Sequence, residues 1–431
     1  MKVSIKQRLA VMFAIMLCVS AAGAPIRCAD RAFEAGAMGA AQIYPDDDFV
    51  FFRARAGGAH RTPYGLFAFN RATGEWTTIG TAENFSAPIS WNGRNIDPET
   101  LFYSRSGYEH IQLGSNSYSI GWDKNRAVVT VTGIEPARYT SDQIPDSGEG
   151  TREYLFKHVQ GARLWFDMRV KANGALYSEG IGCFDTSQKT FTIYTAAQLH
   201  FDPGRTIVTR MTGAGDRVIL GVSFCDADTC LNRGGFIAAP RQGAPVLYTS
   251  DNALLPRGAV LDIVPDGDMF WIASAHGVTQ WKPGMNTNAV YGFSDQARVF
   301  GAAPLRLWSG GAPAEGLEIP DNTAVTLLNA TDAGFTAAVP YPIEAWTSGD
   351  HATPALNISG ENLQLDGGNS ISFYSAPVAG AQFLGNLQIT AASATLKILQ
   401  KQDQWVKVDL SRSLWFPPQN IVLYMIPTDV K

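Results

Sequence analysis

Short apolar runs separated by turn residues dominate this chain. Runs of roughly four to eight residues rich in Val, Ile, Phe, Tyr and Trp alternate with Gly, Pro, Asn and Asp, which is the pattern of strands and turns. Only residues 29–43 have the composition of a short helix. The sequence therefore predicts an all-β fold, and 42 glycines among 431 residues fit a protein built from many short strands joined by turns.

Five segments repeat one pattern: a glycine, an apolar strand, a polar turn, and a second strand that often ends in an aromatic residue. They begin at Gly65, Gly121, Gly180, Gly235 and Gly277. The intervals are 56, 59, 55 and 42 residues, and one four-stranded propeller blade needs roughly 40–50 residues. We therefore predict a β-propeller of about five to seven blades over residues 41–300, with large residues on both faces of its strands. A large β-sandwich and a β-helix are the alternatives.

The last repeat carries a family resemblance. Its sequence, AVLDIVPDGDMFWIASAHGVTQWKPG, combines an Asp-Gly turn at Asp266, an aromatic strand at Phe270, a glycine turn at Gly277 and a Lys-Pro corner at Lys282. It resembles a repeat of the two-component-regulator type of β-propeller, and the resemblance implies the propeller fold. We predict that His276 is a loop-tip residue rather than a catalyst, and that Gly277 supplies the positive φ of the hairpin.

Residues after about 300 contain a second repeat. Serine and aromatic positions recur with offsets of 66, 70 and 69 residues: Ser309 with Ser375, Phe335 with Trp405, and Trp346 with Trp415. Both copies are similar to the bacterial SH3-like domain, whose motifs correspond to LWSGGAP, VTLLNATDAGF and AWTS in the first copy and to FYSAPV, LKILQKQDQWVKV and LWFP in the second. The resemblance implies two small SH3-like β-barrels, at residues 303–356 and 369–431, joined by a linker at 357–368.

The same resemblance implies a shallow ligand groove lined by aromatic side chains. An aromatic ring offers a flat apolar face to a sugar or a peptide at little cost in side-chain entropy. The candidate groove residues are Trp308, Trp346, Phe373, Tyr374, Trp405 and Trp415. Placement in the hydrophobic core is the alternative for most of them, and it is the favoured interpretation for Phe335.

The first 24 residues predict a secretory signal peptide. Basic residues precede the apolar run LAVMFAIMLCV, and Ala22-Gly23-Ala24 matches a cleavage site. Cleavage after Ala22 and an uncleaved membrane anchor are alternatives, and residues 25–40 are interpreted as an N-terminal linker. We expect a periplasmic or secreted protein with no membrane span after cleavage. Its net charge would be about −8, which argues against a nucleic-acid partner.

Four cysteines lie outside the predicted signal peptide. Cys225 and Cys230 bracket a four-residue turn, and we predict a disulfide between them. The remaining pair, Cys28 and Cys183, is the second disulfide candidate, and free thiols are the alternative. A zinc site is not predicted, because the spacing is not C-x-x-C and no histidine is near Cys225 or Cys230 in the sequence.

No motif in the sequence establishes catalysis. G-x-S-x-G, the P-loop and a strand-linked G-x-G-x-x-G are absent, and the six histidines lack metal-ligand spacing. Residues 46–48, all aspartate, and the pair Asp226 and Asp228 are interpreted as turn residues rather than calcium ligands. We therefore predict no catalytic residue, no metal and no cofactor. A glycosidase, the best enzyme alternative, would need a carboxylate pair drawn from Asp123, Glu135, Asp146, Glu153, Asp185 and Asp262.

These observations predict an exported, non-enzymatic binding or scaffold protein of the bacterial cell envelope. The propeller would bind one partner, and the SH3-like resemblance implies that the C-terminal modules bind peptidoglycan peptides or envelope proteins. Two weak modules in one chain would gain affinity through their effective concentration. The alternatives are a secreted carbohydrate-active propeller enzyme with SH3-like targeting modules, and an accessory subunit of a sensor.

Overall fold

The computed structural model consists of antiparallel β-sheets, so the all-β fold class is confirmed. It describes residues 38–56, 63–81, 88–98, 107–144, 150–172, 174–225, 230, 233–240, 243–253, 255, 258–274, 277–282, 289–314, 316–331, 334–353, 356–368, 370–388 and 394–427. Residues 38–43 belong to the first strand, which corrects the short helix expected over 29–43. Pairing with a neighbouring strand outweighs the weak helical preference of this alanine-rich segment.

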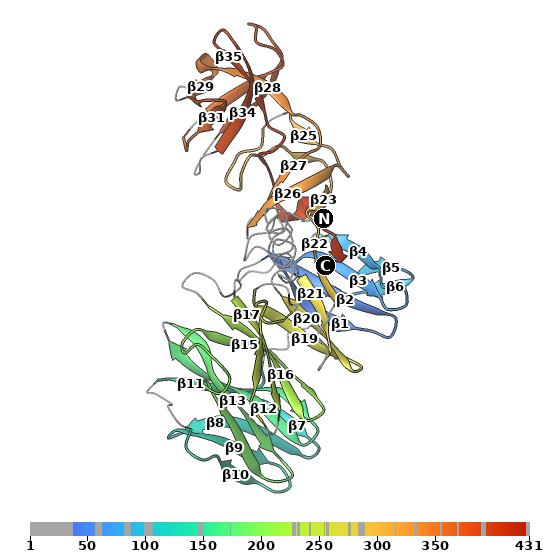
Figure 1. Ribbon diagram of the computed structural model, residues 1–431, viewed down its shortest axis with the longest axis vertical. Helices are drawn as coiled ribbons and strands as arrows, with labels where there is room; N and C mark the ends of the chain where they lie inside the picture. The colour runs from blue at the N-terminus through green and yellow to red at the C-terminus, as the bar shows by residue number, and fades with distance from the viewer. Residues whose placement is uncertain are drawn as a thin grey trace, which may run out of the picture.

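Five sheets of four consecutive strands occupy residues 38–293 (Figure 1). The first two consist of β1 (Met38–Pro45), β2 (Phe49–Ala56), β3 (Pro63–Asn70) and β4 (Trp76–Thr81), and of β7 (His110–Leu113), β8 (Asn116–Asp123), β9 (Arg126–Thr132) and β10 (Ala137–Thr140). The third consists of β11 (Arg152–Gln160), β12 (Arg163–Ala172), β13 (Ala175–Asp185) and β14 (Thr190–Thr195). The fourth consists of β15 (Thr206–Ala214), β16 (Arg217–Phe224), β17 (Arg233–Pro240) and β18 (Val246–Tyr248). The fifth begins with β19 (Val260–Asp266), β20 (Met269–Ser274), β21 (Gly277–Trp281) and β22 (Ala289–Phe293).

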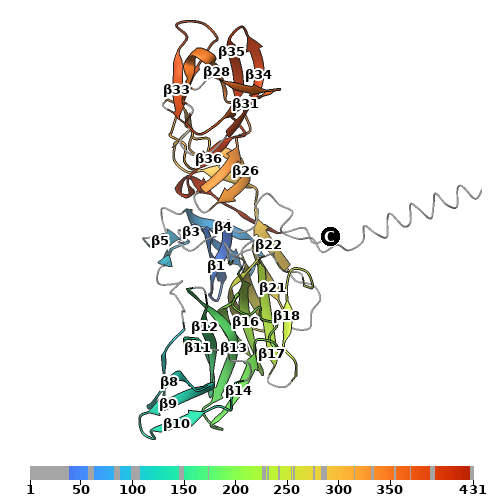
Figure 2. The same ribbon diagram turned by 90° about the vertical axis from the view of Figure 1, so that its left-hand side faces the viewer.

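The five sheets stack face to face in the spatial order second, third, fourth, fifth, first (Figures 1 and 2). Consecutive residues of β12 pack against different neighbouring sheets: Trp165 packs against the fourth sheet, and Phe166 packs against the second. In the fifth sheet Phe270 packs with the fourth sheet, and Trp271 packs with the first. This alternation is the packing on both faces that the repeat predicts.

The first sheet ends this stack. Its outer face, which includes Phe51 and Leu66, is covered by Ile96 and Trp91 of a hairpin formed by β5 (Ile89–Trp91) and β6 (Arg94–Ile96). Among the described residues, no extensive strand contact joins the first sheet to the second. That part of the chain therefore forms an open, propeller-like stack.

The glycine repeat marks the third strand of four sheets. The third-strand glycines are Gly65, Gly180, Gly235 and Gly277. The segment at Gly121 differs, because it forms β8 and β9, the middle strands of the second sheet. Gly277 has a φ of 154°, and a Cβ there would lie 2.2 Å from the carbonyl oxygen of Tyr291. Glycine is required because β21 and β22 approach closely at this point. His276, the predicted loop-tip residue, lies outside the described residues.

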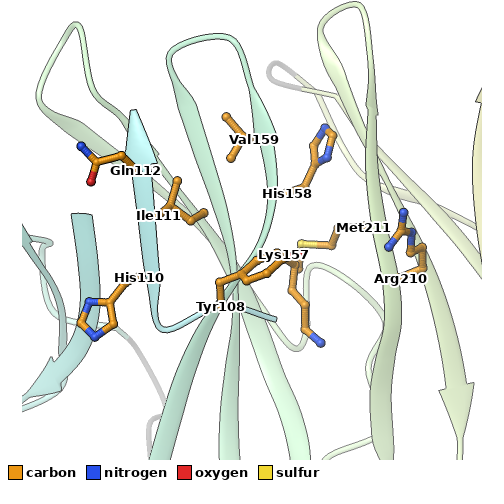
Figure 3. A pocket seen from close by; sticks show the side chains of 9 residues that line it. All are labelled: Tyr108, His110, Ile111, Gln112, Lys157, His158, Val159, Arg210 and Met211. Atoms are coloured by element: carbon orange, nitrogen blue, oxygen red, sulfur yellow. The ribbon is translucent and has the colours of Figure 1, made fainter. Parts of the chain in front are cut away.

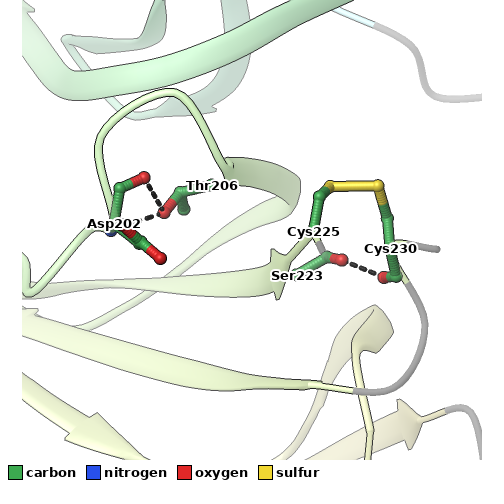
Figure 4. Close-up of a disulfide and its surroundings, with 5 residues drawn as sticks. All are labelled: Asp202, Thr206, Ser223, Cys225 and Cys230. Atoms are coloured by element: carbon green, nitrogen blue, oxygen red, sulfur yellow. Dashed lines mark hydrogen bonds between the residues drawn. A yellow bond between two sulfur atoms is a disulfide. The ribbon is translucent and has the colours of Figure 1, made fainter. Parts of the chain in front are cut away.

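Cys225 and Cys230 form a disulfide directly after β16, as predicted (Figure 4). The Ser223 hydroxyl donates a hydrogen bond to the carbonyl oxygen of Cys230 beside it. Cys183 is buried between the third and fourth sheets. Its predicted partner, Cys28, lies outside the described residues, so the second disulfide stays a prediction.

Residues 296–422 form two further sheets and a short strand pair at one end of the molecule (Figure 2). The smaller sheet consists of β23 (Gln296–Val299), β26 (Ala324–Thr331), β27 (Gly334–Ala338), β36 (Leu414–Phe416) and β37 (Ile421–Val422). The larger consists of β28 (Glu344–Ser348), β29 (Ala352–Thr353), β30 (Asn357–Ser359), β31 (Asn362–Leu365), β32 (Ser370–Tyr374), β33 (Phe383–Gln388), β34 (Ala394–Gln402) and β35 (Trp405–Asp409). The strand pair is β24 (Ala303–Pro304) with β25 (Glu318–Ile319), and the 3-10 turns are Gly349–His351 and Pro418–Asn420.

Strands from both predicted SH3-like copies share these sheets. β27 of the first copy pairs with β36 of the second, and β28 pairs with β35. Residues 357–368, predicted as a linker, contribute β30 and β31, and β31 pairs with β34. The boundaries at 303–356 and 369–431 therefore do not separate two sheets, and the C-terminal unit is interleaved. The matched motifs are local strand-and-turn patterns, which do not determine which strands pair with each other.

The end of the chain returns to the propeller-like stack. β38 (Met425–Pro427) pairs with β22 and becomes the fifth strand of the fifth sheet. The Ser294 N–H donates to the carbonyl oxygen of Tyr424 at 2.7 Å, and the Thr78 hydroxyl donates to that of Leu423 at 3.0 Å. One hydrophobic core continues from the first and fifth sheets into the C-terminal unit. Backbone pairing and apolar packing therefore both join the two parts.

The predicted signal peptide lies outside the described residues, as do Asp226 and Asp228. β1 begins at Met38, within the segment 25–40 that was interpreted as a linker. Within the described part of the chain, no helix has the length and apolar character needed to cross a bilayer.

Candidate functional site

The first strands of four sheets lie side by side, with β11 against β15, β15 against β19, and β19 against β1. Each carries a β-bulge in its pairing with the second strand of its own sheet. The bulged residues are Ala41, Lys157, Thr209 and Leu261, and the last three recur every 52 residues. A bulge bends its strand and redirects a side chain, and bulges are frequent beside functional sites.

A polar residue follows each bulge. These residues are Gln42, His158, Arg210 and Asp262. Arg210 Nε lies 3.2 Å from Asp262 Oδ1, and Asp262 Oδ2 accepts a hydrogen bond of 2.9 Å from the Ile43 backbone N–H. A row of polar groups therefore crosses the inner strands from the fourth sheet, through the fifth, to the first.

A pocket with a volume of about 410 Å³ opens between β7, β11 and β15, at the end of this row (Figure 3). Figure 3 shows Ile111, Val159 and Met211 near the middle, His158 and Arg210 toward one side, His110 and Gln112 toward the other, and Tyr108 and Lys157 below. The second sheet reaches this position through a backbone bridge between Tyr108 and Phe156, with hydrogen bonds of 2.7 and 2.9 Å.

Lys157 is the bulged residue of β11, and its side chain lines the pocket. Among the described residues, its ammonium group makes no hydrogen bond and no ion pair. Burial lowers the pKa of Lys157; the charges of Asp167 and Glu153 oppose this shift, whereas those of Arg169 and Arg210 add to it. A partly buried ammonium group without a partner favours an anionic ligand, because an anion would restore the electrostatic stabilisation lost from water.

His158 follows the bulge and lies between β11 and β15. Burial lowers its pKa to about 4, and the positive charge of Arg210 contributes to the shift. The imidazole is therefore neutral near pH 7, where it can both donate and accept a hydrogen bond. A Cβ at Gly213 would lie 2.9 Å from His158 Nε2, so the glycine leaves the space that this imidazole occupies.

Two carboxylates lie behind the pocket rather than in its lining. Asp167 on β12 is fully buried, and its Oδ2 accepts a hydrogen bond of 2.7 Å from Arg169 Nε. Its Oδ1 has no hydrogen-bond partner among the described residues. Glu153 lies opposite Arg169 on the neighbouring strand. None of the residues that line the pocket is acidic, so its polar groups offer positive charge and hydrogen-bond donors.

Three of the six acids predicted for a glycosidase are held in turns or ion pairs. Asp123 forms an exposed ion pair in the second sheet. Asp185 accepts hydrogen bonds from Ser187 in the β13–β14 turn, and Asp262 is paired with Arg210. Asp146 lies outside the described residues. Glu135 is exposed after β9, and Glu153 lies opposite Arg169 on the neighbouring strand.

The aspartates after β1 hold a turn. Arg94 lies 2.6 Å from both Asp46 and Asp48, and Arg71 lies 2.6 Å from Asp266 at the matching turn of the fifth sheet. These contacts agree with the interpretation of Asp46 and Asp48 as turn residues. No group of three or more metal-binding side chains occurs in the described part of the chain.

Three of the six predicted groove residues come together on the larger C-terminal sheet. Trp346 pairs with Tyr374 across the strands, and the rings of Tyr374 and Trp405 lie 5.7 Å apart, edge to face. Phe383 is 47% exposed, and its ring lies 5.8 Å from that of Tyr374. The Lys407 ammonium lies 5.8 Å from the Trp346 ring centre. We call Trp346, Tyr374, Phe383 and Trp405 the C-terminal aromatic cluster.

The other three predicted groove residues lie elsewhere. Phe373 is fully buried in the core, because alternate residues of β32 point to opposite faces of the sheet. Trp415 belongs to the smaller sheet and packs over Gly334. Trp308 packs against the hydrophobic core, with its indole N–H buried. The six residues therefore do not line one groove.

The residues that line the pocket are not among those predicted from the sequence. Its members come from three strands that are distant in the sequence, and no spaced motif joins them. A second hollow of about 390 Å³, near the disulfide, was also missed; its polar lining includes His200, Asp202, Arg233 and Asp251. Figure 4 shows Asp202 hydrogen-bonded to Thr206 in the loop that precedes β15.

Fold and site together define an all-β protein with a propeller-like stack of sheets, a pocket lined by cationic, imidazole and apolar groups, and an interleaved C-terminal unit. No family model matches the chain, and no curated protein sequence matches it.

The solved structures that are weakly similar to this chain include the following three. A structure from a study of two prolyl endopeptidases shares 11% identity at a TM-score of 0.26, covering 74% of this chain and 49% of that one. The Bombyx mori GH32 β-fructofuranosidase BmSUC1 shares 8% sequence identity at a TM-score of 0.24, and the match covers 91% of this chain and 92% of that one. Extracellular domains 1–2 of Drosophila Semaphorin 1b share 9% sequence identity at a TM-score of 0.19, and the match covers 87% of this chain and 86% of that one. This chain therefore spans about half the length of the endopeptidase.

Proposed function

We propose that this is a non-enzymatic binding protein, exported to the bacterial cell envelope, that holds a ligand in the pocket between β7, β11 and β15. The observation that carries the proposal is the lining of the pocket. Cationic, imidazole and apolar side chains surround about 410 Å³, and no carboxylate is among them. Sites for small ligands typically measure roughly 300–1,000 Å³ and place a few polar groups in an apolar wall.

The pocket is poorly suited to glycoside hydrolysis. That reaction uses two carboxyl groups roughly 5–10 Å apart. Asp262, the acid closest to the pocket along the polar row, is held by Arg210 and by the Ile43 N–H. Its charge balances the Arg210 cation, and no residue of the pocket lining supplies a second carboxyl group. These features favour binding over the carbohydrate-active alternative.

Two further points belong to the proposal. We infer that the five sheets are five blades of an incomplete propeller, and the equivalent bulges in four of them support this count. Export is supported by the signal-like residues 1–24 and by the Cys225–Cys230 disulfide, which persists in oxidising compartments.

The test is to identify what the pocket retains. The full chain is expressed with its leader in a bacterial host, purified, and equilibrated with the small-molecule fraction of an envelope extract. Mass spectrometry of the denatured complex should find a ligand that Lys157→Met loses and that stays chemically unchanged on incubation. Lys171→Met removes an exposed lysine of the adjacent strand and should keep the ligand. The same ligands on Lys157→Met and wild type, or conversion of the ligand, would contradict the proposal.

The C-terminal aromatic cluster favours a second binding function. Phe383 is 47% exposed over the buried rings of Trp346 and Trp405, and an exposed ring with a lysine in the same cluster suits sugar or peptide contacts of the kind found in peptidoglycan. Phe383→Ser should reduce retention on insoluble peptidoglycan at least threefold. Val378→Ser, which changes an exposed residue outside the cluster, is the control. Equal retention of the two variants and the wild type would remove this function.

A further inference from the structure

The positively charged side chains that line the pocket have no acidic residue beside them in the lining. Arg210 is balanced by Asp262 at 3.2 Å, and Asp262 is itself anchored by the Ile43 N–H. Asp167 and Glu153 lie next to Arg169, behind the lining.

Two side chains of the lining, Lys157 and Arg210, carry a positive charge. Within the described residues, Lys157 is the one of the two that makes no ion pair. The bulge places its side chain there, so the position of the charge is built into the backbone.

The uncharged part of the lining is apolar. Ile111 and Met211 are buried, and Val159 is 37% exposed. His158 is neutral near pH 7, so it adds hydrogen bonding without adding charge. A ligand would therefore gain one ionic contact and a patch of apolar contact in the same cavity.

Resting on the proposed binding function, we propose that the pocket takes a small amphipathic monoanion. Its single negative group lies between Lys157 and Arg210. Its apolar group lies against Ile111, Val159 and Met211.

The volume limits the size of this ligand. A water molecule takes about 30 Å³ in the liquid, so a pocket of 410 Å³ has room for roughly a dozen non-hydrogen atoms. A carboxylate with a short aryl-alkyl group matches this size. A phosphate monoester has similar dimensions but carries nearly two charges at neutral pH, one more than the lining balances.

Isothermal titration with matched probes tests the charge requirement. Hydrocinnamate, hydrocinnamyl alcohol and phenethyl phosphate share an aryl-ethyl group and differ in the head group. Hydrocinnamate should bind at least tenfold more tightly than the neutral alcohol, and more tightly than the phosphate. Lys157→Met should weaken hydrocinnamate at least tenfold and leave the alcohol within twofold, and Lys171→Met should change neither. Thermal unfolding of each variant verifies that it is folded.

Asp262→Asn tests the balance of charges. Asparagine keeps an oxygen for the Ile43 N–H but removes the negative charge that lies 3.2 Å from Arg210. The affinity for the phosphate relative to the carboxylate should rise at least threefold. A loss of packing alone would weaken both probes together and leave this ratio unchanged, which would overturn the assignment of a monoanion.

The outcomes separate this inference from the proposed function. Two results would overturn the ligand class. One is equal affinity for hydrocinnamate and the alcohol. The other is no detectable binding of hydrocinnamate or of phenethyl phosphate when the anion is in about tenfold excess over the protein. The proposed function stands in that case if mass spectrometry still finds a ligand that Lys157→Met loses. If no such ligand is found while hydrocinnamate binds as expected, the pocket selects anions and the envelope function is rejected.

Discussion

Replacement of Gly277 by alanine should destabilise the protein by about 3–5 kcal/mol. A non-glycine residue at its φ of 154° costs about 1–3 kcal/mol. The new Cβ would also lie 2.2 Å from the Tyr291 carbonyl oxygen, so β21 and β22 must separate by about 1 Å. That movement weakens the pairing of Gly277 with Gly292 and of Val278 with Tyr291, at roughly 0.5–1.5 kcal/mol for each hydrogen bond.

Urea unfolding followed by tryptophan fluorescence measures this loss, because Trp271 and Trp281 lie in the same sheet. Gly267→Ala is the matched control: its φ is 62°, but nothing lies within 4 Å of its Cβ position, so only about 1–2 kcal/mol of backbone strain is expected. We also expect His276→Ala to leave stability nearly unchanged. If Gly277→Ala costs no more than Gly267→Ala, the close approach of β21 and β22 is refuted.

Two further results are expected. Replacing Cys225 and Cys230 by serine should lower the free energy of unfolding by about 2 kcal/mol, because the bridge closes a loop with a sequence separation of only 5 residues; a wild type whose denaturant midpoint does not respond to reductant would contradict this. Acidification below pH 6.5 should destabilise the protein, because unfolded His158 takes up a proton near that pH while the folded imidazole resists protonation down to about pH 4. The full contribution is present above pH 6.5 and is lost as the pH falls, by at most about 1 kcal/mol per unit after allowance for partial exposure. His158→Gln should remove that part of the slope between pH 6.5 and 4, and identical slopes in the two proteins would show that His158 is not desolvated.

The strand hairpins were predictable because their signals are local. A glycine, an apolar run and an aromatic end mark each third and fourth strand, and the structure forms these hairpins at Gly65, Gly180, Gly235 and Gly277. The reason is steric, since the third-strand glycine lies where a Cβ would meet the neighbouring backbone at Gly180, Gly235 and Gly277. The same logic placed the Cys225–Cys230 disulfide, because a short turn brings the two cysteines together whatever the rest of the fold does.

The C-terminal unit could not be divided correctly from its motifs. The aligned tryptophans Trp346 and Trp415 occupy similar local patterns, yet they lie in different sheets. Strand pairing depends on contacts between residues far apart in the sequence, and a repeated strand-and-turn pattern is compatible with several pairings. The predicted groove residues are therefore spread over two sheets and the core, and in the C-terminal aromatic cluster Trp346 and Trp405 are buried, which the residue types alone do not reveal.

A sequence signal for the polar row was present in two of the sheets. Residues 42–48, QIYPDDD, match residues 262–268, DIVPDGD, with the bulge just before each segment and an ion-paired aspartate in each turn. The match places Gln42 and Asp262 at equivalent positions. In the third and fourth sheets only the order of an apolar residue, the bulged residue and a polar residue is kept, at Phe156 to His158 and Val208 to Arg210, and three residues are too short a pattern to identify.

The position of the pocket follows from this repeated backbone. Equivalent bulges present one polar side chain from each inner strand, and the chemistry depends on which residue occupies the position. Between the fourth and fifth sheets a cation meets an anion, Arg210 with Asp262, and the charges cancel. Between the third and fourth sheets the same geometry brings Lys157 and His158 next to Arg210, and no carboxylate enters the lining. The second sheet lacks the bulge and joins through Tyr108, which leaves room for a cavity there. The proposed ligand site therefore lies where the repeat lacks both the charge partner and the regular neighbouring strand.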